Sequence, residues 1–137
     1  MYPPELVAPM SKDLTTAGFE SLLTPEEVVA ELENSNGTAL LVVNSVCGCA
    51  AANARPGVKI ALQNEKQPAK LLTVFAGVNT EATAKAREYL LPYPPSSPAI
   101  ALFKDGRLVH FLERHHIEGR SAMMIAENLK AAFNDFC

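Results

Sequence analysis

Two cysteines separated by one glycine are the residues of this sequence best suited to chemistry. Cys47, Gly48 and Cys49 follow an apolar segment, and the third cysteine, Cys137, is the last residue. So few cysteines do not form a stabilising disulfide framework. In a reducing compartment a close pair is more often catalytic, redox-sensing or metal-binding than structural. We therefore expect the function at this pair.

A disulfide between Cys47 and Cys49 is geometrically accessible but weakly stabilising. The Cα atoms of bridged cysteines lie roughly 4.4 to 6.8 Å apart, which residues i and i+2 of a turn can reach. The closed loop is very short, so the entropic stabilisation is small and strain is expected. Gly48 adds no side chain to the ring and permits unusual backbone angles. The spacing indicates a pair that switches between reduced and oxidised states.

The flanking segments distinguish the two sulfurs. The apolar run 39–43 predicts a buried strand, and the alanine-rich segment 50–54 begins a predicted helix, so the pair lies at a strand-to-helix junction. Backbone N–H groups at a helix N-terminus stabilise a thiolate. Cys47 precedes the helix and is expected to be the more exposed sulfur. We assign Cys47 as the nucleophile and Cys49 as the resolving thiol.

The residues alone leave two other interpretations of the pair open. Both cysteines could be small buried apolar side chains at the end of a strand. A metal or iron–sulfur site needs about four ligands, whereas the chain adds only Cys137, His110, His115 and His116, at no recognisable ligand spacing. We predict no bound metal or other cofactor, and the alternative function is a non-catalytic binding protein or metal carrier.

Ser97 and Pro98 end a proline-rich stretch, 92–98, that leads directly into an apolar segment. A cis peptide bond before Pro98 would make a rigid turn facing the cysteines. The Ser97 backbone could then pair with an extended segment of a substrate. The alternative is an ordinary proline-rich surface loop. We predict Gly48, Ser97 and Pro98 as substrate-binding residues.

Helices and strands alternate along the chain, which favours an α/β layer fold with a mixed central sheet and an N-terminal helical extension. Strands are predicted over 39–43, 71–76, 99–103 and 108–112, with turns at 34–37 and 104–106. Helices are predicted over 4–16, 25–33, 50–62, 80–91 and 121–136. The details expected within these helices are a capping box of Thr24 and Glu27, a kink at Pro56 and Gly57, a cap at Thr80, and a solvated side over 83–87.

Composition narrows the class of protein. The 137 residues are 48% apolar and 20% charged, which fits one domain spanning 1–137 with a real core. The net charge is −3 and no basic run offers a patch for phosphates, so nucleic acid is not an expected partner. Apolar stretches are far shorter than the roughly 20 residues of a membrane span. Residues 1–5 lack the pattern of a secretory signal, so a cytoplasmic location is expected.

The order strand, cysteine pair, helix, strand, helix, proline, hairpin and terminal helix resembles the thioredoxin fold. The pair departs from the thioredoxin motif, because it is Cys-Gly-Cys and no Trp precedes it. A second set of motifs, over nearly the whole chain, resembles the bacilliredoxin family. These motifs are Asn44-Ser45-Val46-Cys47-Gly48-Cys49-Ala50, Arg55-Pro56, Val74-Phe75-Ala76-Gly77, Glu81-Ala82-Thr83-Ala84-Lys85, Pro95-Ser96-Ser97-Pro98, Arg114-His115, Ile117-Glu118-Gly119 and Cys137.

This resemblance implies a bacterial cytosolic protein that removes the small thiol bacillithiol from S-bacillithiolated client proteins. It implies that Cys47 attacks the mixed disulfide and takes the bacillithiol, and that Cys49 or a second bacillithiol releases it. A flavin disulfide reductase would regenerate the thiol pool, and members of the family are also described as disulfide isomerases. His116 stands where the family has an acidic residue, so we interpret His115 and His116 as a solvated loop. Cys137 follows a helix whose last carbonyls disfavour a thiolate, and is expected to be a poor nucleophile.

Overall fold

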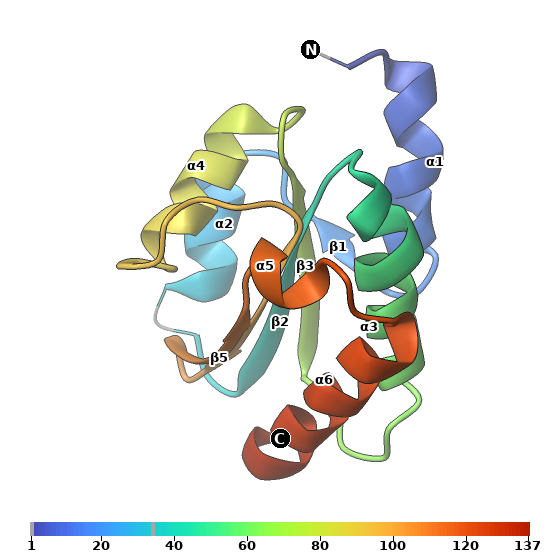
Figure 1. Ribbon diagram of the computed structural model, residues 1–137. Helices are drawn as coiled ribbons and strands as arrows, with labels where there is room; N and C mark the ends of the chain where they lie inside the picture. The colour runs from blue at the N-terminus through green and yellow to red at the C-terminus, as the bar shows by residue number, and fades with distance from the viewer. Residues whose placement is uncertain (1, 34) are drawn as a thin grey trace.

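The computed structural model describes residues 2–33 and 35–137 and has a mixed sheet at its centre (Figure 1). The sheet order is β1-β3-β2-β4-β5, in which β1, β3 and β2 are parallel and β4 is antiparallel to both of its neighbours. The strands are β1 (Glu20–Ser21), β2 (Thr38–Asn44), β3 (Lys70–Phe75), β4 (Ala99–Lys104) and β5 (Arg107–Leu112). The predicted thioredoxin-like α/β fold, with a helix ahead of the first strand, is confirmed.

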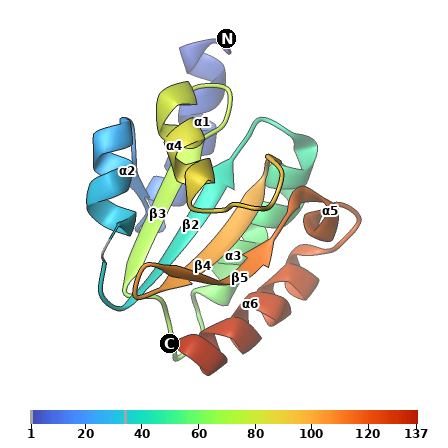
Figure 2. The same ribbon diagram turned by 90° about the vertical axis from the view of Figure 1, so that its left-hand side faces the viewer.

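Helices cover both faces of the sheet. The helices are α1 (Pro4–Thr15), α2 (Pro25–Leu32), the π-helical segment η1 (Ala50–Ala54), α3 (Arg55–Ala61), α4 (Thr80–Glu88), α5 (Arg114–Ile117) and α6 (Ala122–Phe136). Figures 1 and 2 show α2 and α4 on one face, and α1, α3 and α6 on the other. Every residue of β2 is buried between these layers, as predicted for a central strand. Within the described ranges, no helix is both long and apolar enough to cross a membrane.

Local signals in the sequence correctly placed several helix ends and turns. The Thr24 hydroxyl accepts a hydrogen bond from the Glu27 N–H (3.2 Å) and so caps α2. The other half of the predicted capping box is wrong, because the Glu27 carboxylate accepts from the Leu23 N–H (2.7 Å) instead. Asp105 and Gly106 have positive φ values of 52° and 79° and form the predicted hairpin turn. Of the turn predicted over 34–37, Asn34 lies outside the described residues.

The irregularity in the helix after the cysteines lies earlier than predicted. Instead of a kink at Pro56 and Gly57, the structure has a π-helical segment at Ala50–Ala54, in which the Arg55 N–H donates to the Ala50 carbonyl. Pro56 has no N–H to donate to a carbonyl of the preceding turn, so a wider turn there sacrifices little hydrogen bonding. The helix then continues regularly through α3.

The predictions for α4 need correction at both ends and on its predicted solvated side. Asn79, not Thr80, precedes the first helical turn, and α4 ends at Glu88, ahead of the proline at 92. Thr83 is only 3% exposed and Arg87 is half-buried, so residues 83–87 are not a solvated side. Small alanines, Ala82 and Ala86, let α4 lie close to the sheet, and the side chains beside them are covered as well.

Gly57 allows α3 and α6 to approach each other closely. A Cβ built on Gly57 would lie 2.8 Å from Ile125 Cγ2 and 3.1 Å from the Ala122 carbonyl oxygen, neither of which is the end of a long flexible side chain. We expect Gly57→Ala to lower the free energy of unfolding by about 1–3 kcal/mol, because overpacking outweighs the better helix propensity of alanine. Urea denaturation measures this change. Gly48→Ala is the control, because its Cβ would meet no atom within 4 Å; an equal effect at both positions would contradict the packing argument.

Candidate active site

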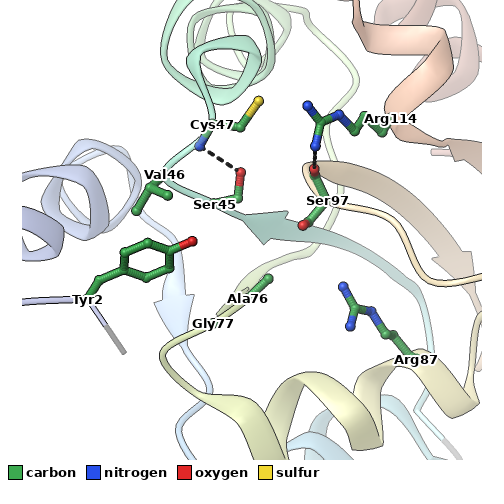
Figure 3. Close-up of a pocket in the computed structure, with 9 residues that line it drawn as sticks. All are labelled: Tyr2, Ser45, Val46, Cys47, Ala76, Gly77, Arg87, Ser97 and Arg114. Atoms are coloured by element: carbon green, nitrogen blue, oxygen red, sulfur yellow. Dashed lines mark hydrogen bonds between the residues drawn. The ribbon is translucent and has the colours of Figure 1, made fainter.

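A cavity of about 570 Å³ lies at the end of the sheet where β2 leads into the cysteine pair (Figure 3). It is lined by Tyr2, Ser45, Val46, Cys47, Ala76, Gly77, Arg87, Ser97 and Arg114. The carboxyl ends of the parallel strands β2 and β3 meet at this edge, and antiparallel β4 begins there, with Ala99 opposite Val43. This topology brings Cys47 and Ser97, fifty residues apart in sequence, to one cavity of the size that binds small ligands.

A buried polar network holds the loop that leads to Cys47. The Asn44 side-chain oxygen accepts from the Ser45 N–H (2.9 Å) and from Arg55 Nη1 (2.9 Å). Arg55 Nη1 also donates to the Ser45 carbonyl (3.1 Å), and the Cys47 N–H donates to Ser45 Oγ (3.1 Å). Arg55 is only 5% exposed and pairs with Asp13 of α1 (3.2 Å). Buried side chains therefore hold the backbone of residues 44–47 in place by hydrogen bonds.

The two sulfurs of the pair have different surroundings. Cys47 lines the cavity, whereas Cys49 packs against the core beneath α3 and α6. Both side chains are half-buried, so the residues around each one separate them more clearly than exposure does. The Cys47 carbonyl accepts from the N–H groups of Ala50 (3.0 Å) and Ala51 (3.3 Å), which places Cys47 at the start of the helix as predicted. The Cys49 N–H donates to Cys47 Sγ (3.4 Å).

Electrostatics favour the thiolate at Cys47. A hydrogen bond from the Cys49 side chain lowers the pKa of Cys47 against the opposing effect of burial, and the Cys49 N–H, the Arg114 charge and the Ala50 N–H lower it further. Burial raises the pKa of Cys49, and the neighbouring Cys47 sulfur raises it again. Cys47 therefore ionises first, which supports its assignment as the nucleophile.

This difference predicts the order in which the cysteines are alkylated. At neutral pH, Cys47 is expected to react with iodoacetamide before Cys49. Cys49→Ala removes the main hydrogen bond to the Cys47 sulfur and is expected to raise the pH midpoint of Cys47 alkylation; Arg114→Gln is expected to raise it by less. Peptide mapping at a series of pH values measures both midpoints. A midpoint that stays in place in both variants would contradict the stated causes of the lowered pKa.

The predicted substrate-binding residues lie in three different environments. The Ser97–Pro98 peptide bond is cis, as predicted, and Ser97 lines the cavity. Pro98 itself is buried and is not among the lining residues. Gly48 is exposed and lies outside the lining; its φ is not positive, so this reduced state does not require a glycine there. Arg114 Nη1 donates to the Ser97 carbonyl (3.3 Å), so this carbonyl already has a partner.

Comparison with known proteins gives full-length matches. A family model described as "Disulphide isomerase" matches residues 2–137. A bacilliredoxin of Cytophaga hutchinsonii is 64% identical over 135 residues, which cover 98% of this chain and 99% of that protein. The chain belongs to the bacilliredoxin family. Two more bacilliredoxins match over the full length. The one from Salinibacter ruber is 53% identical over 99% of this chain and 81% of that protein. The one from Halalkalibacterium halodurans is 52% identical over 99% of this chain and 94% of that protein.

His115 and His116 lie in the helical turn α5 rather than in the expected solvated loop, and no histidine is among the residues that line the cavity. Among residues 2–33 and 35–137, one group of three potential ligands has its ligand atoms within 4.8 Å of one another: Glu113, His115 and His116. The Glu113 carboxylate bonds His115 Nε2 (2.9 Å), and the Glu113 N–H donates to His116 Nδ1 (3.0 Å), so these groups already satisfy one another. The group contains neither cysteine of the pair and gives a metal carrier built on that pair no support.

Cys137 lies at the other end of the sheet from Cys47. Phe136 lines a surface hollow with Lys104 and Asp105, at the end of β4 that pairs with the start of β2. Figure 1 shows the C-terminus at the opposite end of the molecule from the start of α3. This separation supports the expectation that the terminal thiol does not resolve an adduct on Cys47.

For the same reason, Cys137→Ser is expected to leave single-turnover removal of the small thiol within about twofold of the parent rate. A tenfold loss would need about 1.4 kcal/mol of transition-state stabilisation, which a thiol at the far end of the sheet does not supply. Rapid-quench mass spectrometry measures the rate. A bridge between Cys47 and Cys137 in peptide maps of oxidised monomer would overturn this expectation.

Proposed function

We propose that this bacilliredoxin removes bacillithiol from S-bacillithiolated proteins, and that Cys47 is its nucleophile. The observation that carries the assignment is the position of the Cys47 sulfur. Cys47 lines the cavity and its sulfur accepts the Cys49 N–H, whereas Cys49 packs against the core. The mixed disulfide of a client protein is the electrophile, and bacillithiol is a co-substrate rather than a bound cofactor.

The first step is an exchange between a thiolate and a disulfide. The Cys47 thiolate attacks the bacillithiol sulfur, a bond forms between these two sulfurs, and the bond to the client sulfur breaks. The client leaves as a thiolate and takes a proton from water. No net oxidation occurs, because one disulfide replaces another. The lowered pKa of Cys47 increases the fraction of this cysteine that is present as the reactive thiolate.

The second step frees Cys47 from its adduct. Cys49 can attack the Cys47 sulfur, which releases bacillithiol as a thiol and leaves a disulfide between the two cysteines. Alternatively, a second bacillithiol attacks the bacillithiol sulfur of the adduct, which releases Cys47 as a thiol and forms bacillithiol disulfide. Burial raises the pKa of Cys49 and limits its attack, so the route through a second thiol competes well. In either case a disulfide remains whose reduction needs an external reductant such as a flavin disulfide reductase.

The experiment that tests this function compares two thiols on one client. A model protein with a single cysteine is prepared as its bacillithiol disulfide and as its glutathione disulfide, and each is mixed with the reduced chain. We expect the model protein's thiol to be released faster from bacillithiol than from glutathione. Equal release from both would contradict bacillithiol as the natural thiol. No release from either would contradict the function itself.

A further inference from the structure

Arg87 of α4 contributes a charge to the cavity that the exchange chemistry itself does not use. Its side chain is half-buried and lines the cavity, and Figure 3 shows its guanidinium extending from α4 toward Ala76 and Ser97. The Nε–H is fully buried, and within the described ranges it has no hydrogen-bond acceptor. The ion pairs of the described residues do not include Arg87 either.

The buried Nε–H of Arg87 is energetically costly because it has no acceptor among the described residues. Burial lowers the pKa of Arg87, because desolvation disfavours the charged form. Arginine nevertheless stays charged in proteins, and its planar fork matches a carboxylate. Among the described residues no hydrogen bond or ion pair engages the rest of the guanidinium either, so its Nη groups can donate charge-assisted hydrogen bonds to an anion that enters the cavity.

The rest of the cavity lining also favours an anion. Arg114 is a second positive side chain there, and none of the described lining residues is an aspartate or glutamate. Arg114 is already engaged, because its Nε pairs with Glu118 (2.6 Å) and its Nη1 donates to the Ser97 carbonyl. Arg87 is therefore the cation whose hydrogen-bonding capacity is free for a ligand.

We propose that Arg87 is a specificity-determining residue that binds a carboxylate of the small thiol while the sulfur of that thiol lies at Cys47. This inference rests on the proposed function and names the part of the substrate that the site recognises. Bacillithiol carries carboxylates on its malate moiety, at the end of the molecule away from the sulfur. The cavity of about 570 Å³ has room for a molecule of this size between Cys47 and α4.

The test compares a free acid with its ester on the same client peptide. A peptide with one cysteine is prepared as its disulfide with bacillithiol and as its disulfide with the dimethyl ester of bacillithiol. Second-order rate constants for transfer to the chain are measured by rapid-quench mass spectrometry. We expect Arg87→Gln to reduce the preference for the acid over the ester about tenfold, the effect of losing one charge-assisted hydrogen bond. Arg87→Lys should retain part of the preference.

Lys85→Gln is the matched control. It removes one positive charge from the same helix, but Lys85 pairs with Glu88 and does not line the cavity. We expect this variant to keep the parental preference. If it loses the preference as Arg87→Gln does, the total positive charge of α4 is responsible for the preference, and the assignment of a direct contact to Arg87 is wrong.

Other outcomes of the same experiment show whether this inference alone fails or whether the proposed function fails as well. A parent that accepts both disulfides equally well overturns the inference alone. If the effect of Arg87→Gln depends on an acidic residue in the peptide and not on the ester, Arg87 binds a carboxylate of the client, and the inference is wrong. A parent that accepts neither disulfide contradicts the function. Titration with S-methyl bacillithiol, which cannot exchange, then decides the inference: weaker binding to Arg87→Gln than to Lys85→Gln supports it, and equal binding overturns it.

Discussion

Cys47→Ala is expected to abolish transfer of bacillithiol from a client protein, by more than about a thousandfold, because removal of a nucleophile leaves only binding effects. Cys49→Ala should still accept the thiol and accumulate as a mixed disulfide, since Cys47, the cysteine that lines the cavity, is still present. Intact mass spectrometry of each variant after mixing with a bacillithiolated peptide distinguishes these outcomes.

The control for this comparison is Cys137→Ser, which removes a thiol at the far end of the sheet. The parent and this control should behave alike. If Cys47→Ala became modified at Cys49 at the parental rate, the roles of the two cysteines would be reversed.

Arg55→Met is expected to lower the free energy of unfolding by about 3 kcal/mol, the cost typical of breaking a buried charged network from one side. The substitution leaves the buried Asn44 oxygen and the Ser45 carbonyl without a donor that they share, and leaves Asp13 without its buried partner. Urea denaturation of the reduced protein measures the change.

Lys59→Met provides a control within the same network. Lys59 also contacts Asp13 (2.5 Å), but its side chain is 40% exposed, so its loss should cost less than about 1 kcal/mol. Equal losses in the two variants would contradict the view that burial, rather than the charge on Asp13, makes Arg55 important. Because Arg55 holds the loop ahead of Cys47, its substitution should also slow alkylation of that cysteine.

The sequence predicted the positions of Cys47 and of the cis Ser97–Pro98 bond, but not most of the other residues that line the cavity. Cys47 and the cis proline were predictable because each depends on local signals: a strand-to-helix junction and an X-Pro bond entering a strand. Arg114 belongs to α5 and Tyr2 lies two residues before α1, and only the tertiary fold brings those segments to the end of β2. Arg87 was assigned to a solvated side because periodicity does not show that the alanines of α4 bring it close to the sheet.

Two elements had no signal that sequence patterns can show. β1 has only two residues, Glu20 and Ser21, and is a strand because it pairs with β3. α5 is a single turn, whose first residues follow a strand without a break in composition. Periodicity requires more residues than either element has. The five long helical segments and four long strands, by contrast, were each predicted within a few residues of their bounds.

Locating the transferred thiol shows whether Cys47 takes bacillithiol from a client protein. The reduced chain is mixed with an equimolar model protein bearing bacillithiol on its only cysteine, quenched with acid within seconds, and analysed by intact mass and peptide mapping. We predict that the model protein loses one bacillithiol and that the chain gains one on Cys47, assigned by fragmentation of the peptide that also contains Cys49, or shows a disulfide between Cys47 and Cys49. Bacillithiol found on Cys137, or a model protein that keeps its bacillithiol, would contradict the account.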